Sequence, residues 1–231
     1  MKSKKIKPRK EVQSNALKAA AYHEIGHAIV QYRCTNYPPF YIEIGSEDGA
    51  FGKVTTDNFD TGNIREIENY VIGLLGGYYS ETLLFETEIK RARKKSQSDL
   101  DKIDKIISNN IKPKQRSLFL RKCRNRCRKI IKLNAYSIKL LMELLFSLKK
   151  IEGQSFEYLM LYIDTRDQNA LAWLGHVGKS DSRFAKAVKF LVHRLARQKQ
   201  LKETNINLET TQGTKKNYAA KSHRNSRILR S

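Results

Sequence analysis

The sequence predicts a mainly α fold with a small β-hairpin or sheet, followed by a basic helical extension and a tail. Several long segments repeat their apolar residues with the 3.6-residue period of an amphipathic helix. One short segment, between Tyr37 and Thr56, instead alternates apolar and polar residues as a strand does. Hydrophobic residues make up 40% and charged residues 29% of the chain, which is typical of a folded, water-soluble protein.

We expect one main domain with basic segments at both ends, because 231 residues suffice for one sizeable core. Six of the first ten residues are Lys or Arg, so a flexible basic arm is expected at 1–12. The folded domain is expected at 13–162 and a basic helical appendage at 163–200. Residues 201–231 contain few large apolar side chains and are expected to form a disordered basic tail.

The first helix is expected to run from Ser14 or Asn15, either of which can cap a helix, to about Cys34. This run is rich in alanine, contains no proline and is helical in period. Pro38 and Pro39 end the helical pattern. The segments YIEI and FGKVTT then alternate like strands on either side of the turn residues SEDG, so a hairpin or small sheet should follow the first helix.

Further helices are predicted from apolar stripes. A second helix is expected at about 64–85, where Gly76 and Gly77 allow another backbone to approach closely. Its buried stripe should consist of Ile64, Ile67, Val71, Leu74 and Leu75. A third helix should begin near Ser98 or Asp99, because an acidic first turn suits the positive end of the helix dipole. The remaining helices are expected at about 115–133, 135–150, 154–162 and 182–198.

The chain carries 45 basic and 23 acidic side chains, a formal net charge of +22. A charge of this size attracts nucleic acid, anionic lipid or acidic proteins. The basic helix at 182–198 and the tail have two interpretations, which the sequence leaves open. They bind nucleic-acid phosphates, or they dock onto an acidic partner protein.

No segment approaches the roughly 18 uncharged apolar residues that a transmembrane helix needs, and no apolar signal core follows the lysine-rich start. The three cysteines, Cys34, Cys123 and Cys127, form no spaced disulfide framework. Cys123 and Cys127 are expected to be small buried residues. We therefore expect a cytoplasmic protein in a reducing compartment.

The segment His23-Glu24-Ile25-Gly26-His27 is an HExxH motif within the first helix. Residues four apart on a helix project together, so His23 and His27 can bind one zinc ion. A zinc ion lowers the pKa of a coordinated water to roughly 7. Glu24 beside it can then act as the general base in peptide hydrolysis.

Such a short motif also occurs by chance in unrelated helices, but its setting favours a metal site. Both histidines share a stripe with Ala16, Ala20 and Val30, so they should face the interior. Two buried imidazoles and a carboxylate are unfavourable unless something binds them.

A catalytic zinc ion usually has three protein ligands, so the third must lie outside the motif. The longer motif HExxHxxGxxH is absent, because Val30 occupies the position of its glycine. Glu43 and Glu47 lie in the expected strand and turn, a poor match to a ligand delivered by a second helix. Asp99, at the start of the third expected helix, is the better candidate.

Three segments together resemble the peptidase domain of the FtsH-type zinc metalloproteases: AAAYHEIGHAIV, GLLGGYYSETLLF and SDLDKI. Their order and approximate spacing agree with the family, and NAYSIKLLMELLFSLKKIEGQSF is similar to its closing helices. The resemblance implies a zincin-like helical fold at 13–162, with Asp99 as the third zinc ligand. The same resemblance implies that Glu81 braces a metal ligand, that FGKVTT borders the cleft and that the protein forms a homo-oligomer.

The sequence departs from this family in two places. Ser98 stands beside Asp99 where the family has asparagine, and KRARKKSQ replaces a short stretch of small residues, so the loop geometry at the site should differ. The phosphate-binding pattern GxxxxGK[ST] is also absent, since GHVGKS has Trp173 in place of the first glycine. We therefore expect ATP-driven unfolding to require a separate ATPase.

The sequence thus predicts a zinc-dependent metallopeptidase that hydrolyses peptide bonds in flexible or unfolded proteins, with zinc on His23, His27 and Asp99 and with Glu24 as base. One alternative is a basic nucleic-acid-binding or adaptor protein with the same fold and no catalysis. Another is a zincin that cuts a single regulatory protein.

Overall fold

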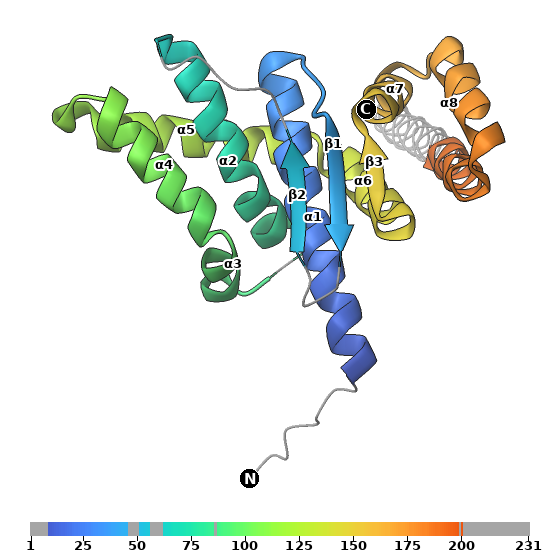
Figure 1. Cartoon of the computed structure of the whole chain (residues 1–231). Coiled ribbons are helices and arrows are strands. Elements are labelled where there is room, and N and C mark those ends of the chain that lie inside the picture. Colours follow the sequence, from blue (N-terminus) through green and yellow to red (C-terminus); the bar gives the residue numbers. More distant parts are fainter. Residues whose placement is uncertain (1–8, 46–50, 56–61, 86, 199, 201–231) are drawn as a thin grey trace, which may run out of the picture. The chain divides into compact units, whose positions relative to one another are not determined.

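The computed structural model describes residues 9–45, 51–55, 62–85, 87–198 and 200. The protein is mainly helical and contains a small three-stranded antiparallel sheet, as the sequence predicted (Figure 1). Within the described part of the chain, no helix combines the length and the apolar composition needed to cross a membrane.

The helices and strands follow one another as α1 (Arg9–Thr35), β1 (Tyr41–Gly45), β2 (Phe51–Thr55), α2 (Ile64–Leu84), α3 (Ile89–Lys95), α4 (Gln97–Asn110), α5 (Pro113–Leu133), α6 (Ala135–Leu148), β3 (Lys150–Glu152), α7 (Gly153–Thr165) and α8 (Gln168–Ser180). A further helical segment occupies residues 182–198. The chain divides into two compact units, Met1–Ala187 and Val188–Ser231.

Helix α1 begins at Arg9, earlier than the expected start at Ser14 or Asn15. The expectation that the basic arm extends to residue 12 is therefore wrong. Residues 9–13 lack glycine and proline and consist mainly of good helix formers, so the helix continues through them. Residues 1–8 of the expected arm, like the expected tail at 201–231, lie outside the described residues.

Strands β1 and β2 form the predicted hairpin, with Ile42 opposite Val54 in an antiparallel register. The third strand, β3, was not predicted. It pairs with the other edge of β1, with Ile42 opposite Ile151, and gives the strand order β2-β1-β3. The sheet lies against α1, and Ile42, Ile44 and Ile151 are buried.

Helix α2 confirms the second predicted helix almost residue for residue. Asn63 caps it, with its side-chain oxygen accepting a hydrogen bond from the Arg65 backbone N–H at 2.9 Å. The helix packs against α1 more extensively than any other pair of elements. The predicted close approach occurs here, because a Cβ on Gly76 would lie 2.5 Å from the carbonyl oxygen of Gly26. Ile64, expected on the buried stripe, is instead exposed, because it opens the helix at its outer end.

The basic stretch after α2, which we expected to shape a loop, contains helix α3. Its only buried residue is Ala92, which explains why no apolar stripe revealed it. Helix α4 follows at once and places Asp99 in its first turn, as predicted. Ile103 and Ile107 bury the inner face of α4, which packs against α2.

The helices after α4 complete the core of the first unit. Helices α5 and α6 pack against α1 and α2, with Cys123, Cys127 and Ile131 buried along α5. The two buried cysteines are confirmed as free thiols. Helix α7 extends to Thr165, so the domain boundary expected at residue 162 falls inside it. Helix α8 packs against α7 through stacked rings of Tyr158 and Trp173.

Candidate metal centre

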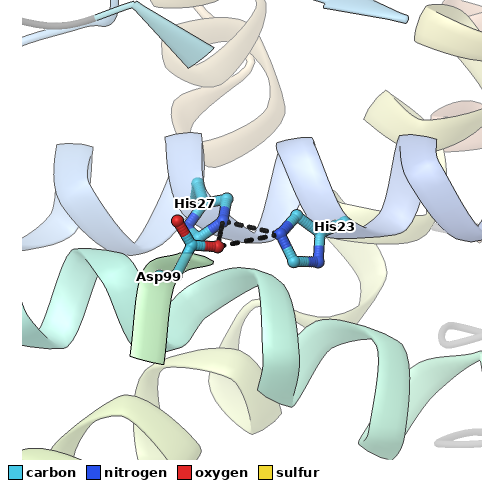
Figure 2. Close-up of side chains that lie close together, drawn as sticks. All are labelled: His23, His27 and Asp99. Carbon is cyan, nitrogen blue, oxygen red and sulfur yellow. Dashed lines mark hydrogen bonds and ion pairs between the residues drawn. The ribbon is translucent and has the colours of Figure 1, made fainter. Parts of the chain in front are cut away.

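The HExxH residues lie in the middle of α1, where that helix packs against α2. His23 and His27 are one helical turn apart and point to the same side, as their spacing predicted (Figure 2). Asp99 approaches from the first turn of α4 and faces both rings. The described residues thus bring together a cluster of His23, His27 and Asp99 that could hold a metal ion.

The three ligand atoms lie close to one another. Nε2 of His23 is 2.9 Å from Nε2 of His27. Oδ2 of Asp99 lies 3.2 Å from Nε2 of His23 and 3.3 Å from Nε2 of His27. A tetrahedral zinc ion with bonds of about 2.0–2.1 Å separates its ligand atoms by about 3.3 Å, so this triangle matches the size of a zinc site.

The hydrogen bonds made by the two Nδ1 atoms, on the outer side of the His23 and His27 rings, determine whether the inner Nε2 atoms can bind a metal ion. Nδ1 of His27 lies 2.8 Å from the carbonyl oxygen of Gly73, which only accepts, and 3.4 Å from the backbone nitrogen of Gly77. The shorter contact requires a proton on Nδ1, so we assign the proton to this nitrogen. Nδ1 of His23 lies 2.8 Å from Oε1 of Glu81 and donates to that carboxylate. In the neutral rings, both Nε2 atoms therefore present lone pairs to each other and to Asp99. Three electron-pair donors at this separation repel one another unless a positive charge lies between them, which is either a metal ion or, in the metal-free protein, a proton on Nε2 of His23.

Glu81 is fully buried on α2, and its two oxygens have different surroundings. Oε1 accepts from His23, whereas Oε2 has no hydrogen-bond partner among the described residues. Nζ of Lys95, at the end of α3, lies 3.9 Å from Oε2. Glu81 thus contacts His23, one of the candidate ligands, where the resemblance to the FtsH-type family implied a residue that braces a ligand. Lys95 was not predicted, because it belongs to a run of cations with no distinguishing sequence signal.

Two glycines leave room for the site. A Cβ on Gly77 would lie 2.5 Å from Nε2 of His27 and 2.6 Å from Nε2 of His23. A Cβ on Gly52, in β2, would lie 2.6 Å from both the carboxyl carbon and Oε1 of Glu24. The absence of side chains at both positions therefore allows the histidines and Glu24 to occupy their observed positions. Gly77 was predicted as a point of close approach, and Gly52 was not.

Burial and neighbouring charges perturb the acidic and basic groups of the site in the metal-free protein. Burial disfavours a charged His23, but hydrogen bonds to Asp99 and Glu81 outweigh it and raise the pKa of His23 to about 10. Burial also opposes ionisation of Asp99, yet its hydrogen bonds to the two histidines hold its pKa well below the ordinary value. Burial is the main reason why the pKa of Glu24 is raised. A raised pKa suits a carboxylate that takes up a proton during a reaction.

A cavity of about 370 Å³ opens onto the cluster. Its walls come from α1, α2, α3, α4 and β2. Gly52, Lys53 and Val54 line it, so FGKVTT borders the cleft as expected. Among the strands that the structure describes, β2 pairs with β1 alone, so it is an edge strand of this sheet. An edge strand beside the site can pair with an extended peptide through its backbone.

The other candidate ligand does not join the cluster. Glu43 is exposed on β1 opposite Lys53, and it is not among the described residues whose ligand atoms cluster. Glu47 lies outside the described residues. Among the candidates that the structure describes, Asp99 alone is brought to the histidines.

No family model matches the sequence, and no curated protein matches it either.

Proposed function

We propose that this protein is a zinc-dependent metalloendopeptidase in which His23, His27 and Asp99 hold the metal. The observation that carries this proposal is the convergence of three electron-pair donors within 3.3 Å of one another, with both outer ring nitrogens already bonded as donors. Two imidazoles, one carboxylate and an open cavity match the donor set of a catalytic zinc site.

When bound, zinc supplies a Lewis acid that activates water and polarises a peptide carbonyl. Glu24 borders the same cavity and takes the proton of the attacking water, then passes it to the leaving amine. Glu81 keeps the Nδ1 proton of His23 on the outer side of the ring, so that Nε2 faces the metal. The reaction therefore needs no covalent intermediate with the protein.

The substrate class follows from the shape of the site and from the sequence. The edge of β2 beside the cavity favours a polypeptide that enters in an extended form. A folded protein does not present such a segment, so we propose flexible or unfolded proteins as substrates. Folded substrates would need a separate ATPase or unfoldase, because the sequence lacks a phosphate-binding loop.

Zinc content and casein cleavage test this function together. The wild-type protein, purified and dialysed, should hold one zinc ion per chain by mass spectrometry and should cleave unfolded casein. Asp99→Ala should lose the metal, and Asp101→Ala, an exposed change two residues further along α4, should keep it. Glu24→Gln should keep the metal but lower kcat by about 100- to 10,000-fold, as loss of a general base does.

Two results would count against a general peptidase. A wild-type protein that neither retains zinc nor binds added zinc tightly would exclude the peptidase. Stoichiometric zinc without cleavage of casein or other unfolded proteins would favour a zincin that cuts one regulatory protein or a non-catalytic protein on the same fold.

A further inference from the structure

Helix α5 has an unusual charge composition for a helix that packs into the core. It carries nine Lys or Arg residues and no Asp or Glu over its 21 positions. Its buried positions are the apolar or weakly polar residues Cys123, Cys127 and Ile131. The charge is therefore confined to the faces of α5 that point away from the core.

Some of these cations have structural partners. Lys122 and Arg126 both pair with Glu68 of α2, at 2.9 and 3.0 Å. Arg116 donates to the backbone carbonyls of Ile111 and Ser108 near the start of α5. Arg128 stands over the ring of Tyr79, with its guanidinium carbon 4.9 Å from the ring centre. These four residues help to fix α5 against the fold.

The remaining cations form what we call the α5 basic row: Lys114, Arg121, Arg124, Lys129 and Lys132. All five are exposed, and none forms an ion pair within the part of the chain that the structure describes. At a rise of about 1.5 Å per residue, the row extends over about 27 Å of the helix. These unpaired cations lie on one side of a rigid helix, within an arc of about 140° at 3.6 residues per turn. There they can face a polymer with regularly spaced negative charges.

Three properties of the row indicate which polyanion it fits. The apolar face of α5 is already buried, so the helix cannot insert that face into a lipid surface. The exposed apolar side chains of α5 are Leu118 and Leu133, which lie near its two ends and about 22 Å apart along the helix. Between Arg121 and Lys132 no apolar side chain is exposed, so the row lacks the central apolar anchor that most protein interfaces have. Nucleic acid needs no such anchor, because its phosphates supply most of the affinity.

We propose that the α5 basic row binds the phosphate backbone of nucleic acid without reading its sequence. No residue of α5 lines the cavity at the metal cluster. Nucleic acid on this row would therefore leave the cavity open, and the binding does not depend on the peptidase activity. A protein of this kind would be held close to other proteins that occupy the same nucleic acid.

Salt-dependent binding of a defined duplex tests the proposal. Fluorescence anisotropy would measure the affinity of the full-length protein for a labelled 24-base-pair DNA between 50 and 300 mM NaCl. The variant Arg121→Gln/Arg124→Gln/Lys129→Gln/Lys132→Gln removes four exposed charges from the row. Its affinity should fall at least tenfold, and its salt slope should be smaller by about 3 to 4, given about 0.9 per phosphate contact.

A matched control distinguishes the contribution of the α5 basic row to DNA affinity from that of the basic tail. The variant Lys215→Gln/Lys216→Gln/Lys221→Gln/Arg224→Gln removes the same number of charges outside the described residues. It should keep most of the affinity and the salt slope. A loss of affinity in this control that equals or exceeds the loss in the row variant would overturn the proposal. Circular dichroism should show the same helix content for both variants.

A second probe distinguishes nucleic acid from an acidic protein. Poly-glutamate should compete with the labelled DNA only weakly at equal charge concentration. If it competes as well as unlabelled DNA, and the row variant abolishes that competition, the row is a site for acidic proteins and the proposal is wrong. Glu24→Gln should bind DNA like the wild type whether or not casein is cleaved, so this test is independent of the peptidase.

Discussion

Nδ1 of His23 and Oε1 of Glu81 are 2.8 Å apart, although 58 residues separate them in the chain. The contact joins α1 to α2 at the metal cluster. It fixes the ring of His23 in the tautomer whose Nε2 is free to bind a cation. A fully buried carboxylate in this position is therefore part of the candidate site, because it orients one of the three clustered residues.

Replacing Glu81 with glutamine should weaken zinc binding while the fold is kept. The amide oxygen can still accept from His23, but the negative charge that favours the metal-bound ring is lost. Such partners typically change metal affinity by about 10- to 100-fold. Competition with a zinc chelator would measure the change. Glu88→Gln, at an exposed position just before α3, is the control and should leave the affinity unaltered.

Gly77→Ala should remove the metal site. The new Cβ would lie within 2.6 Å of Nε2 of both histidines, so the rings must move. We expect loss of stoichiometric zinc and a stability loss of about 1–3 kcal/mol. Gly175→Ala is the matched control, because α8 is also a helix and nothing lies within 4 Å of a Cβ there. It should stabilise the protein by about 0.5–1 kcal/mol in urea unfolding.

Gly52→Ala should separate metal binding from turnover. Its Cβ would overlap the carboxyl group of Glu24 but would leave the three ligands untouched. The variant should therefore keep one zinc ion per chain and lose most of its casein cleavage. A variant that lost zinc as completely as Gly77→Ala would show that β2 supports the ligands and not only Glu24.

Glu68 should contribute stability in a pH-dependent way. Its partial burial opposes ionisation, but hydrogen bonds from Lys122 and Arg126 outweigh this and lower its pKa. A carboxyl whose pKa is lower in the folded state stabilises the protein above its unfolded pKa of about 4.3, and this contribution disappears as the pH falls through the folded pKa. Glu68→Gln should therefore cost about 1 kcal/mol at pH 7.

Urea unfolding at pH 7 and at pH 3.5 would measure the contribution of Glu68. The difference between Glu68→Gln and the wild type should narrow at the lower pH. Asp104→Asn, an exposed change on α4, is the control for the general effect of removing one negative charge. An undiminished difference at the lower pH would mean that the glutamine disturbs packing instead of an ionic contact.

The helical fold and the HExxH pair could be predicted because they depend on short-range spacing. Residues four apart on α1 face one side whatever surrounds them, and the apolar stripe of α2 was long enough to locate that helix. Asp99 was harder to predict as a member of the cluster, because its distance from His23 is set by how α4 packs against α2. Spacing within the sequence carries no information about such a contact, and the resemblance to a family supplied it.

The features that were missed lack a sequence signal of their own. Strand β3 has three residues, and only its pairing with β1 makes it a strand. Helix α3 buries a single alanine, so its periodicity was invisible. The early start of α1 at Arg9 was missed because Ser14 and Asn15 are good capping residues, yet helix formers precede them. Lys95 could not be singled out from its basic neighbours.

The pairing of β1 with β3 sets an order of assembly for the growing chain. The partners of β1 in this ladder are made roughly 110 residues after β1 itself, so the sheet has a high contact order. The candidate metal ligands and Glu81, which contacts His23, all lie before residue 100, on elements that pack mainly on one another. During synthesis, α1, α2 and α4 can therefore meet before the last strand emerges from the ribosome. Zinc bound at that stage would hold the N-terminal half together while β3 is still being made.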